Sequence, residues 1–182
     1  MKVRGTRRIY EGRVVNLRVD DMEFQAGKHG DIEIVEHGGG VAIIAQPAAD
    51  SIILVRQFRP STGRRLWEIP AGKLERGEEP AACAGRELQE ETGYRAAVLQ
   101  KLWSFYTAPG FCSELLHLFQ AQGLSRGEPS PDEHEDITVE IFKVAEAWAL
   151  VERDELPDAK SQIALAWLRG NAAVAAGAIG RP

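Results

Sequence analysis

A segment near the middle of the chain, residues 72–94, groups several carboxylates directly after a glycine loop. Gly72 and Gly77 bracket the turn. Pro80 suits the first turn of a helix, because the N–H that proline lacks has no partner there in any case. Gly93 suits the residue that ends a helix. The segment therefore predicts a short acidic helix that runs from Pro80 to the residue before Gly93.

The glutamates of this helix gather on one side. At 3.6 residues per turn, Glu87, Glu90 and Glu91 fall within an arc of roughly 100°, beside an apolar stripe that can face a core. Like charges this close repel one another, but Arg86 lies one turn before Glu90 and can pair with it. Glu87 and Glu91 are then left to bind a hard divalent cation through oxygen, Mg²⁺ or Mn²⁺, with a phosphate as the expected partner. Taken alone, residues 87–91 are more typical of a solvated acidic helix.

The spacing of the whole segment favours the metal hypothesis. It resembles the signature box of the Nudix hydrolase family, in which glycines, acids and an arginine stand at fixed offsets. The matching positions are Gly72, Glu78, Arg86, Glu87, Leu88, Glu90, Glu91 and Gly93. Tyr94 stands where the family has an aliphatic residue, and its ring can still be buried.

Composition restricts the class of protein. The chain has 182 residues, 44% hydrophobic and 27% charged, which is typical of one main domain with a small appendage. Its formal net charge of −5 argues against a nucleic-acid surface, so an anion site must be local or assisted by a metal. Cys83 and Cys112 are too few for a disulfide framework and are expected to be reduced thiols. No apolar run reaches about 18 residues, so we expect a cytoplasmic protein that is neither secreted nor membrane-spanning.

The first part of the chain has the pattern of strands. Apolar and polar residues alternate between residues 8 and 37, which predicts an antiparallel sheet of about three strands. Such a sheet is marginal alone and needs a partner surface, either the main domain or a second copy of the chain. Three consecutive glycines, residues 38–40, mark the junction. We therefore expect an N-terminal sheet over residues 1–39 and a main domain over residues 40–182.

The main domain begins with two buried strands. Residues 41–45 and 51–55 are near-continuous apolar runs, with a hairpin turn expected at residues 47–50. A polar loop, residues 123–136, carries the acidic cluster 132–136, which is either a solvated loop or the carrier of a catalytic carboxylate. Further strands are expected at residues 97–99, 102–106, 115–119 and 137–142, and helices at residues 145–152 and 158–169.

The segment that leads into the glycine loop carries another candidate acid. Trp67 and Glu68 point to opposite faces of an extended segment, so Trp67 is expected in the core while Glu68 can reach the metal site. Arg56 and Arg59 lie at the end of an earlier strand. Each arginine taken alone is more typical of solvated surface charge.

Three further features resemble the ADP-ribose pyrophosphatase branch of the Nudix family. The strand end at residues 55–60 is followed by Glu-Ile-Pro-Ala-Gly at residues 68–72, Pro109 lies sixteen residues after Gly93, and a sheet precedes the domain. The resemblance covers residues 41–169 and implies an α+β protein, a Nudix α/β/α sandwich with a mixed sheet plus a small N-terminal antiparallel β-sheet. In that branch the N-terminal sheet helps to form a domain-swapped homodimer.

The same resemblance implies the metal ligands. Glu87 and Glu91 are the expected ligands. Glu90 and the carbonyl oxygen of Ala71 complete a cage for two or three Mg²⁺ ions, with Mn²⁺ as the alternative. Glu90 therefore also counts among the catalytic residues.

The resemblance also implies how the substrate is bound and attacked. Arg59 is expected to contact a substrate phosphate. The catalytic base of the branch lies on the acidic loop, where Glu135 is the best match and Glu133 the near alternative. The full set of substrate-binding candidates is Arg56, Arg59, Glu68 and Pro109.

The expected reaction is hydrolysis of the pyrophosphate of ADP-ribose, a nucleoside diphosphate sugar, to AMP and ribose 5-phosphate. The runner-up substrate is another nucleotide sugar such as GDP-mannose, since the box binds metal and diphosphate and does not contact the base. A regulatory nucleotide-binding module without turnover is the weaker alternative, because all the acids of the box are present. For base recognition, the N-terminal region offers Tyr10 and Phe24.

Overall fold

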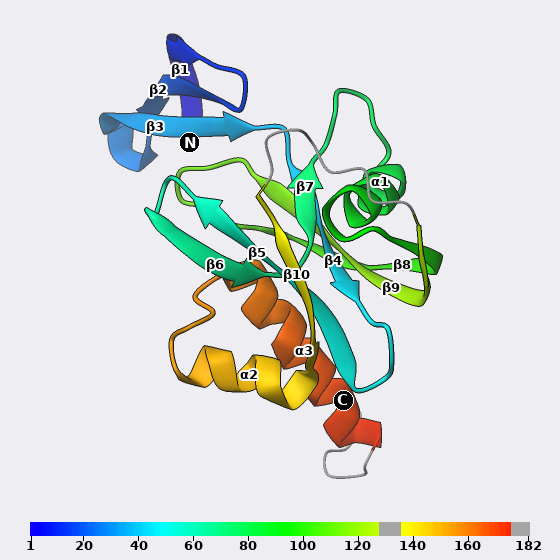
Figure 1. The fold of residues 1–182 in the computed structure, drawn as a ribbon. Helices are drawn as coiled ribbons and strands as arrows, with labels where there is room; N and C mark the ends of the chain where they lie inside the picture. The colour runs from blue at the N-terminus through cyan, green and yellow to red at the C-terminus, as the bar shows by residue number, and fades with distance from the viewer. Residues whose placement is uncertain (128–135, 176–182) are drawn as a thin grey trace.

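The computed structural model describes residues 1–127 and 136–175 (Figure 1). Its strands are β1 (Lys2–Glu11), β2 (Val15–Glu23), β3 (His29–His37), β4 (Gly40–Ala45), β5 (Ser51–Arg59), β6 (Arg64–Glu68), β7 (Ala71–Lys73), β8 (Tyr94–Tyr106), β9 (Leu115–Arg126) and β10 (Thr138–Lys143). Its helices are α1 (Pro80–Thr92), α2 (Val144–Glu152) and α3 (Ala159–Ala175), with a 3-10 turn η1 (Gln25–Gly27). The predicted bounds of the acidic helix, α1, are confirmed.

Two sheets make the middle layer of the main body. Strands β7, β4, β9 and β8 lie side by side in that order, and β4 runs parallel to β9 while the other pairs are antiparallel. Strands β10, β5 and β6 form a second, antiparallel sheet. Helix α1 covers one side of this layer, and α2 and α3 cover the other (Figure 1). The predicted α/β/α sandwich with a mixed sheet is confirmed.

Strand β4 shows that both faces of this layer are buried. Every residue of β4 is buried, and its side chains alternate between two cores. The core beneath α1 contains Val41, Ile43, Ala45, Ala84 and Leu88. The core against α2 and α3 contains Ala42, Ile44, Leu54, Leu165 and Leu168. A strand covered on both faces has to be apolar at every position, which explains the continuous apolar run in the sequence.

The expected hairpin between the first two buried strands is wrong, because β4 and β5 belong to different sheets. At residues 40–42 both edges of β4 are already paired, with β9 in parallel and with β7 antiparallel. The turn itself is present: the Ser51 N–H donates a 3.1 Å hydrogen bond to the Ala48 carbonyl oxygen. The two apolar runs predict strands correctly but hold no information about which strands pair.

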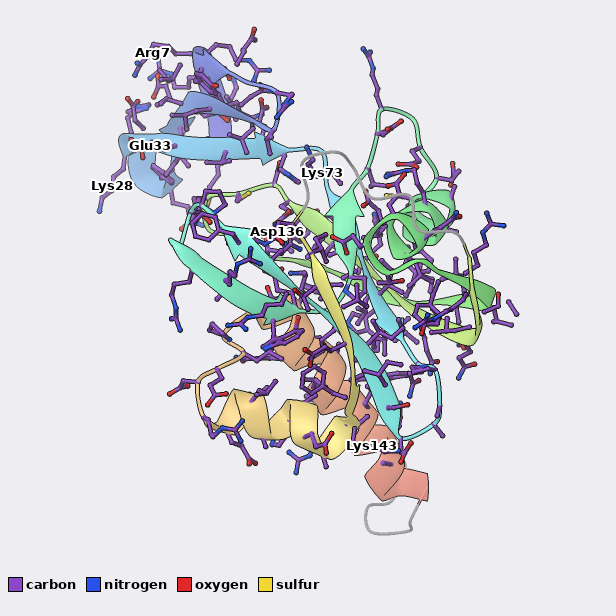
Figure 2. All side chains as sticks on the ribbon, in the orientation of Figure 1. Arg7, Lys28, Glu33, Lys73, Asp136 and Lys143 are labelled. Carbon is purple, nitrogen blue, oxygen red and sulfur yellow. The ribbon has the colours of Figure 1, made fainter. Side chains whose placement is uncertain are left out.

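The predicted N-terminal antiparallel sheet is confirmed, and it starts earlier than expected, at Lys2. Every residue of β1 is exposed, and side chains such as Arg7 lie on this sheet apart from the main body (Figure 2). Strand β3 connects the sheet to the main body through two backbone hydrogen bonds of Val35. Its N–H donates to the Phe111 carbonyl oxygen at 2.8 Å, and its carbonyl oxygen accepts from the Ser113 N–H at 2.9 Å.

Helix α3 is joined to the segment that leads into β7. Asp158 precedes the helix and accepts a 3.0 Å hydrogen bond from the Ser161 N–H, as an N-cap residue does. The buried hydroxyl of Ser161 accepts a 2.8 Å hydrogen bond from the Ile69 N–H. The helix ends at Ala175, later than the sequence suggested. In the part of the chain that the structure describes, no helix is long and apolar enough to cross a membrane.

Candidate active site

Close packing between β7 and α1 determines where the acidic side chains of the helix lie. Gly72 is in β7, directly against the Glu87 carboxyl group: a Cβ atom at position 72 would lie 1.8 Å from Glu87 Cδ. Gly40 on β4 is also tightly packed, since its Cβ would lie 2.5 Å from the Gly72 carbonyl oxygen. Any larger residue at position 72 would displace the Glu87 carboxyl group, so glycine there lets this carboxyl group lie against β7.

Arg86 forms ion pairs with glutamates on and beside α1. Its Nη1 lies 2.8 Å from both Glu87 Oε1 and Glu90 Oε2, which confirms the predicted pair with Glu90. Its Nε lies 3.0 Å from Glu78 Oε1, and this hydrogen bond is the main reason that the pKa of Glu78 falls to about 2. Arg86 pairs with Glu87 as well, which the sequence did not predict, because the guanidinium is long enough to reach both carboxylates.

Glu91 is held beside the same strand. It is nearly buried, and its Oε2 accepts a 2.9 Å hydrogen bond from the Ala71 N–H. Carboxylate and carbonyl oxygens are the ligands that hard cations prefer, so the donor atoms near α1 have suitable chemistry. Within residues 1–127 and 136–175, however, no group of three or more His, Cys, Asp or Glu side chains is arranged so that it could hold a metal ion. Arg86 supplies the balancing positive charge in this arrangement.

A second set of charges lies at the end of β5. Arg59 binds Glu68 through two hydrogen bonds, Nε to Oε1 at 2.7 Å and Nη2 to Oε2 at 2.6 Å. Lys160 Nζ lies 2.5 Å from the same Oε2 and 3.0 Å from Asp158 Oδ1. Burial alone would raise the pKa of Glu68, but the hydrogen bonds and charges of Arg59 and Lys160 outweigh it and hold the pKa below its ordinary value. Glu68 is therefore an ionised carboxylate although it is only 1% exposed.

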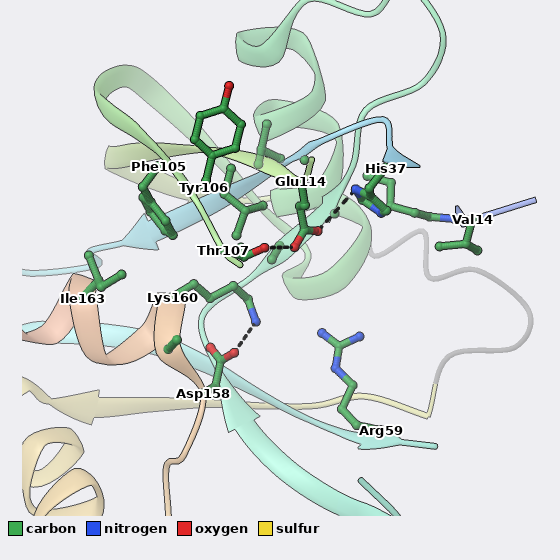
Figure 3. Close-up of a pocket in the computed structure, with 17 residues that line it drawn as sticks. Val14, His37, Arg59, Phe105, Tyr106, Thr107, Glu114, Asp158, Lys160 and Ile163 are labelled. Atoms are coloured by element: carbon green, nitrogen blue, oxygen red, sulfur yellow. Dashed lines mark hydrogen bonds and ion pairs between the residues drawn. The ribbon is translucent and has the colours of Figure 1, made fainter. Parts of the chain in front are cut away.

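Members of both sets of charges line one cleft. A hollow of about 780 Å³ is lined by residues that include Arg59, Glu87, Glu90 and Glu91. It adjoins a second hollow of about 520 Å³, and the residues common to both are Val14, His37, Arg59, Ala71, Gly72 and Lys73. The second hollow extends to Phe105, Tyr106, Glu114, Asp158 and Lys160 (Figure 3). The cleft thus has an acidic part along α1 and a part lined by aromatic and polar side chains, and Arg59 lines both.

Several of the predicted site residues meet in this cleft, namely Arg59, Ala71, Glu87, Glu90 and Glu91. Arg56 does not line it. Its guanidinium lies over the Trp67 ring, 5.6 Å from the centroid, because successive side chains of β5 point to opposite faces. Trp67 packs against the core with its ring 5.1 Å from that of Phe142, as expected for a core residue.

The remaining predicted residues lie elsewhere. Glu68 is almost fully buried and contacts Arg59, and Pro109 lies in an exposed turn; neither is among the residues that line the cleft. Glu133 and Glu135, the candidates for the catalytic base, lie outside the described residues.

Part of the cleft has residues that the sequence did not reveal. Glu114 accepts a 2.7 Å hydrogen bond from the Thr107 hydroxyl and lies 3.4 Å from His37 Nδ1 (Figure 3). No local pattern connects these residues, because they come from three different segments of the chain. Lys160 lies within the helix expected at residues 158–169, but nothing in the sequence connects it with Glu68.

Replacing Glu68 by glutamine should lower the free energy of unfolding by about 2–4 kcal/mol, because Arg59 and Lys160 lose their shared counter-charge. Glu68 has a lowered pKa in the folded state, so its contribution is present above its ordinary value of 4.5 and is lost as the pH falls. Urea unfolding at pH 7 should therefore show a large difference between the variant and the wild type, and unfolding below pH 4.5 a smaller one.

Glu155→Gln is the matched control for this experiment. Glu155 pairs with Arg153 at 2.9 Å on the surface, and exposed pairs contribute little, so the free energy of unfolding should hardly change. A Glu68→Gln effect no larger than that of this control would show that the buried ion pairs do not stabilise the fold.

Comparison with known proteins agrees with the fold and the site. The model of the NUDIX domain family matches residues 36–165. An ADP-ribose pyrophosphatase of Bacillus subtilis (strain 168) is 47% identical over 163 residues, which cover 88% of each chain. A methanol dehydrogenase activator of Bacillus methanolicus is 42% identical over 166 residues, 90% of each chain.

A solved structure shows the same fold. The crystal structure of an ADP compounds hydrolase superposes with a TM-score of 0.83, at 24% identity, and covers 98% of this chain and 96% of that chain. The family match spans most of the chain and contains α1, Arg59 and the whole sandwich except residues 166–175 of α3. The chain therefore belongs to the Nudix hydrolase family.

Proposed function

We propose that this protein hydrolyses the pyrophosphate of ADP-ribose to AMP and ribose 5-phosphate. The observation that carries the proposal is the cleft, in which the acidic face of α1 and the Arg59 guanidinium line the same space. A diphosphate needs positive charge, which Arg59 and divalent cations on the carboxylates would supply together. The name of the Bacillus subtilis relative supports ADP-ribose as the substrate.

The metal would be Mg²⁺, with Mn²⁺ as the alternative, as two or three ions. Glu87, Glu90, Glu91 and the carbonyl oxygen of Ala71 would hold them, since hard cations prefer such oxygen ligands. When bound, these ions neutralise the diphosphate and lower the pKa of the attacking water. Because Arg86 pairs with Glu87 and Glu90, the ions would compete with it for both carboxylates.

Arg59 would bind a phosphate of the substrate. Its Nε and Nη2 are engaged by Glu68, and its Nη1 takes no part in that pair. A guanidinium whose plane is already fixed loses little freedom when it binds an anion. We assign the phosphate contact to Arg59 rather than Arg56, since Arg56 stacks on Trp67 and does not line the cleft.

Glu135 would act as the general base, with Glu133 as the alternative. It would take a proton from the water whose oxygen bonds to one phosphorus, while the bond from that phosphorus to the bridging oxygen breaks. The residue that follows, Asp136, is described by the structure (Figure 2) and is ion-paired with Arg65 on β6. The assignment of the base rests on the resemblance of the acidic loop to that of the ADP-ribose pyrophosphatase branch.

Glu135→Gln should lower kcat by about 10²–10⁴-fold while KM hardly changes, because a general base contributes to the transition state and little to substrate binding. Glu133→Gln is the matched control, and it should keep most of the activity. The reverse result would assign the base to Glu133. Normal turnover by both variants would reject a base on the acidic loop.

Glu91→Gln should raise the Mg²⁺ concentration for half-maximal activity by at least about tenfold, because the change removes a charged ligand. The control is Glu79→Gln, which alters an exposed glutamate just before α1 and should leave the Mg²⁺ dependence unchanged. A Mg²⁺ titration of both variants makes the comparison. Wild-type dependence in Glu91→Gln would count against the metal cage.

A substrate panel tests the function itself. The enzyme is assayed with and without Mg²⁺ on ADP-ribose, GDP-mannose, other nucleotide sugars and dinucleotides, and the products are identified. We expect ADP-ribose to have the highest kcat/KM, AMP and ribose 5-phosphate to be its products, and chelation to stop the reaction. A preference for GDP-mannose would support the runner-up, and hydrolysis of none would favour a regulatory nucleotide-binding module.

We further propose a cytoplasmic, domain-swapped homodimer, in which residues 1–39 form the dimerisation unit and residues 40–182 the hydrolase domain. A three-stranded sheet is marginal without a partner surface. In support, the N-terminal sheet exposes the apolar side chains of Val3, Ile9, Tyr10 and Ile32. Light scattering in solution should give the mass of a dimer, and a monomer would reject this assembly.

A further inference from the structure

One carboxylate oxygen of Glu68, Oε2, accepts hydrogen bonds from two positively charged side chains. Arg59 Nη2 lies 2.6 Å from Oε2, and Lys160 Nζ lies 2.5 Å from the same atom. Arg59 also binds the other oxygen, so it already pairs the whole carboxylate in the bidentate geometry that is strongest for arginine. Arg59 alone thus gives a hydrogen bond to each oxygen of Glu68, and Lys160 adds a third.

Lys160 occupies a position that does not favour a lysine. It lies in the first turn of α3, where a cation meets the positive end of the helix dipole. Its side chain is only 11% exposed, so its ammonium group has also lost most of its hydration. Asp158, 3.0 Å away, offsets part of this cost. Helix stability alone would favour another residue at this position.

Arg59 has competing carboxylates nearby. The hydrogen bond with Glu68 is the main reason that the pKa of Arg59 is raised, and the charges of Glu91 and Asp158 raise it further. A guanidinium that turned toward Glu91 would neutralise a carboxylate of α1 and would no longer be directed at a phosphate. Arg59 is thus attracted to other carboxylates besides Glu68, and in its pair with Glu68 it does not neutralise a carboxylate of α1.

Lys160 restrains the Glu68 carboxylate from a different layer of the fold. It is anchored on α3, whereas Arg59 and Glu68 belong to β5 and β6. Because Lys160 holds Oε2 while Arg59 bonds to both oxygens, the carboxylate cannot rotate to follow the guanidinium without losing the lysine. Figure 3 shows Lys160 and Arg59 on neighbouring walls of the cleft.

We propose that Lys160 is a positioning residue: by fixing the Glu68 carboxylate, it holds the Arg59 guanidinium in the orientation that binds the substrate diphosphate. Lys160 acts through Glu68 and Arg59 and does not itself bind the diphosphate. The inference rests on the proposed function, because it takes Arg59 as the phosphate-binding residue.

A double-mutant cycle of Lys160→Met and Arg59→Gln tests this inference. In the wild-type background, Lys160→Met should lower kcat/KM for ADP-ribose by at least about tenfold, mainly through KM. In the Arg59→Gln background the same change should alter kcat/KM by less than about twofold, because no guanidinium is left to position. The control Lys143→Met, at an exposed lysine that pairs with Asp50 at 2.7 Å, should change nothing.

Two results of the cycle would overturn the inference. An equal loss in both backgrounds would show that Lys160 acts on the substrate independently of Arg59. A normal kcat/KM with a lowered Tm would show that Lys160 serves only stability. If Lys160→Met does not fold by circular dichroism, Lys160→Gln, which keeps a hydrogen-bond donor but no charge, takes its place with the same expected pattern.

Failure of the proposed function can be told apart from failure of this inference. If the wild type hydrolyses no compound of the substrate panel, the proposed function fails. The cycle is then measured as Kd for ADP by calorimetry. Weaker binding by Lys160→Met that disappears in the Arg59→Gln background supports the positioning role, and equal weakening in both backgrounds, or none in either, overturns it.

Discussion

The charge of Arg86 makes the acidic surface of α1 possible. Carboxylates on adjacent turns of a helix repel one another, and the guanidinium reduces that repulsion by binding Glu78, Glu87 and Glu90 together. A single exposed pair of this kind would contribute little, but these groups are largely shielded from solvent and share one cation. The contact of α1 with β7, and with it the shape of the cleft, depends on the helix tolerating these charges.

The sandwich brings together charges that no single element could present. Helix α1 lies on one side of the sheets and α3 on the other, so the acidic face and Lys160 approach the cleft from opposite layers (Figure 1). Strand β5 crosses between them and ends at Arg59, which lines both parts of the cleft. The hydrogen bond between Ile69 and Ser161 fixes α3 relative to β7 at this point. The buried strands thus set the distance between the groups that would bind the metal and those that would bind the phosphate.

Local signals in the sequence were enough to predict α1 and the buried strands, whereas the order of the layers came from the family resemblance. Pro80 and Gly93 mark the ends of the helix by backbone chemistry that needs no tertiary contact. The apolar runs of β4 and β5 similarly report burial on both faces. Strand pairing was not predictable in this way, because the parallel partner of β4 is β9, which comes much later in the chain.

The same difference between local signals and distant contacts explains which site residues could be predicted. The acids of α1 were found because helical periodicity puts them together. Two other contacts join residues from distant segments: His37 with Glu114, and Lys160 with Glu68. Periodicity in the sequence cannot predict contacts of this kind. Two further contacts could be found only in the structure. Arg86 reaches Glu87 as well as Glu90, and Gly72 makes room for the Glu87 carboxyl group.

The separation of Glu68 and Lys160 along the chain has a consequence for how the protein is made. They are 92 residues apart, so a chain emerging from the ribosome has completed β5 and β6 long before α3 exists. A nascent chain that ends before Lys160 lacks both the ammonium group that contacts Glu68 and the Ser161 hydroxyl that receives the Ile69 N–H. These two contacts can therefore form only after translation has passed the first turn of α3.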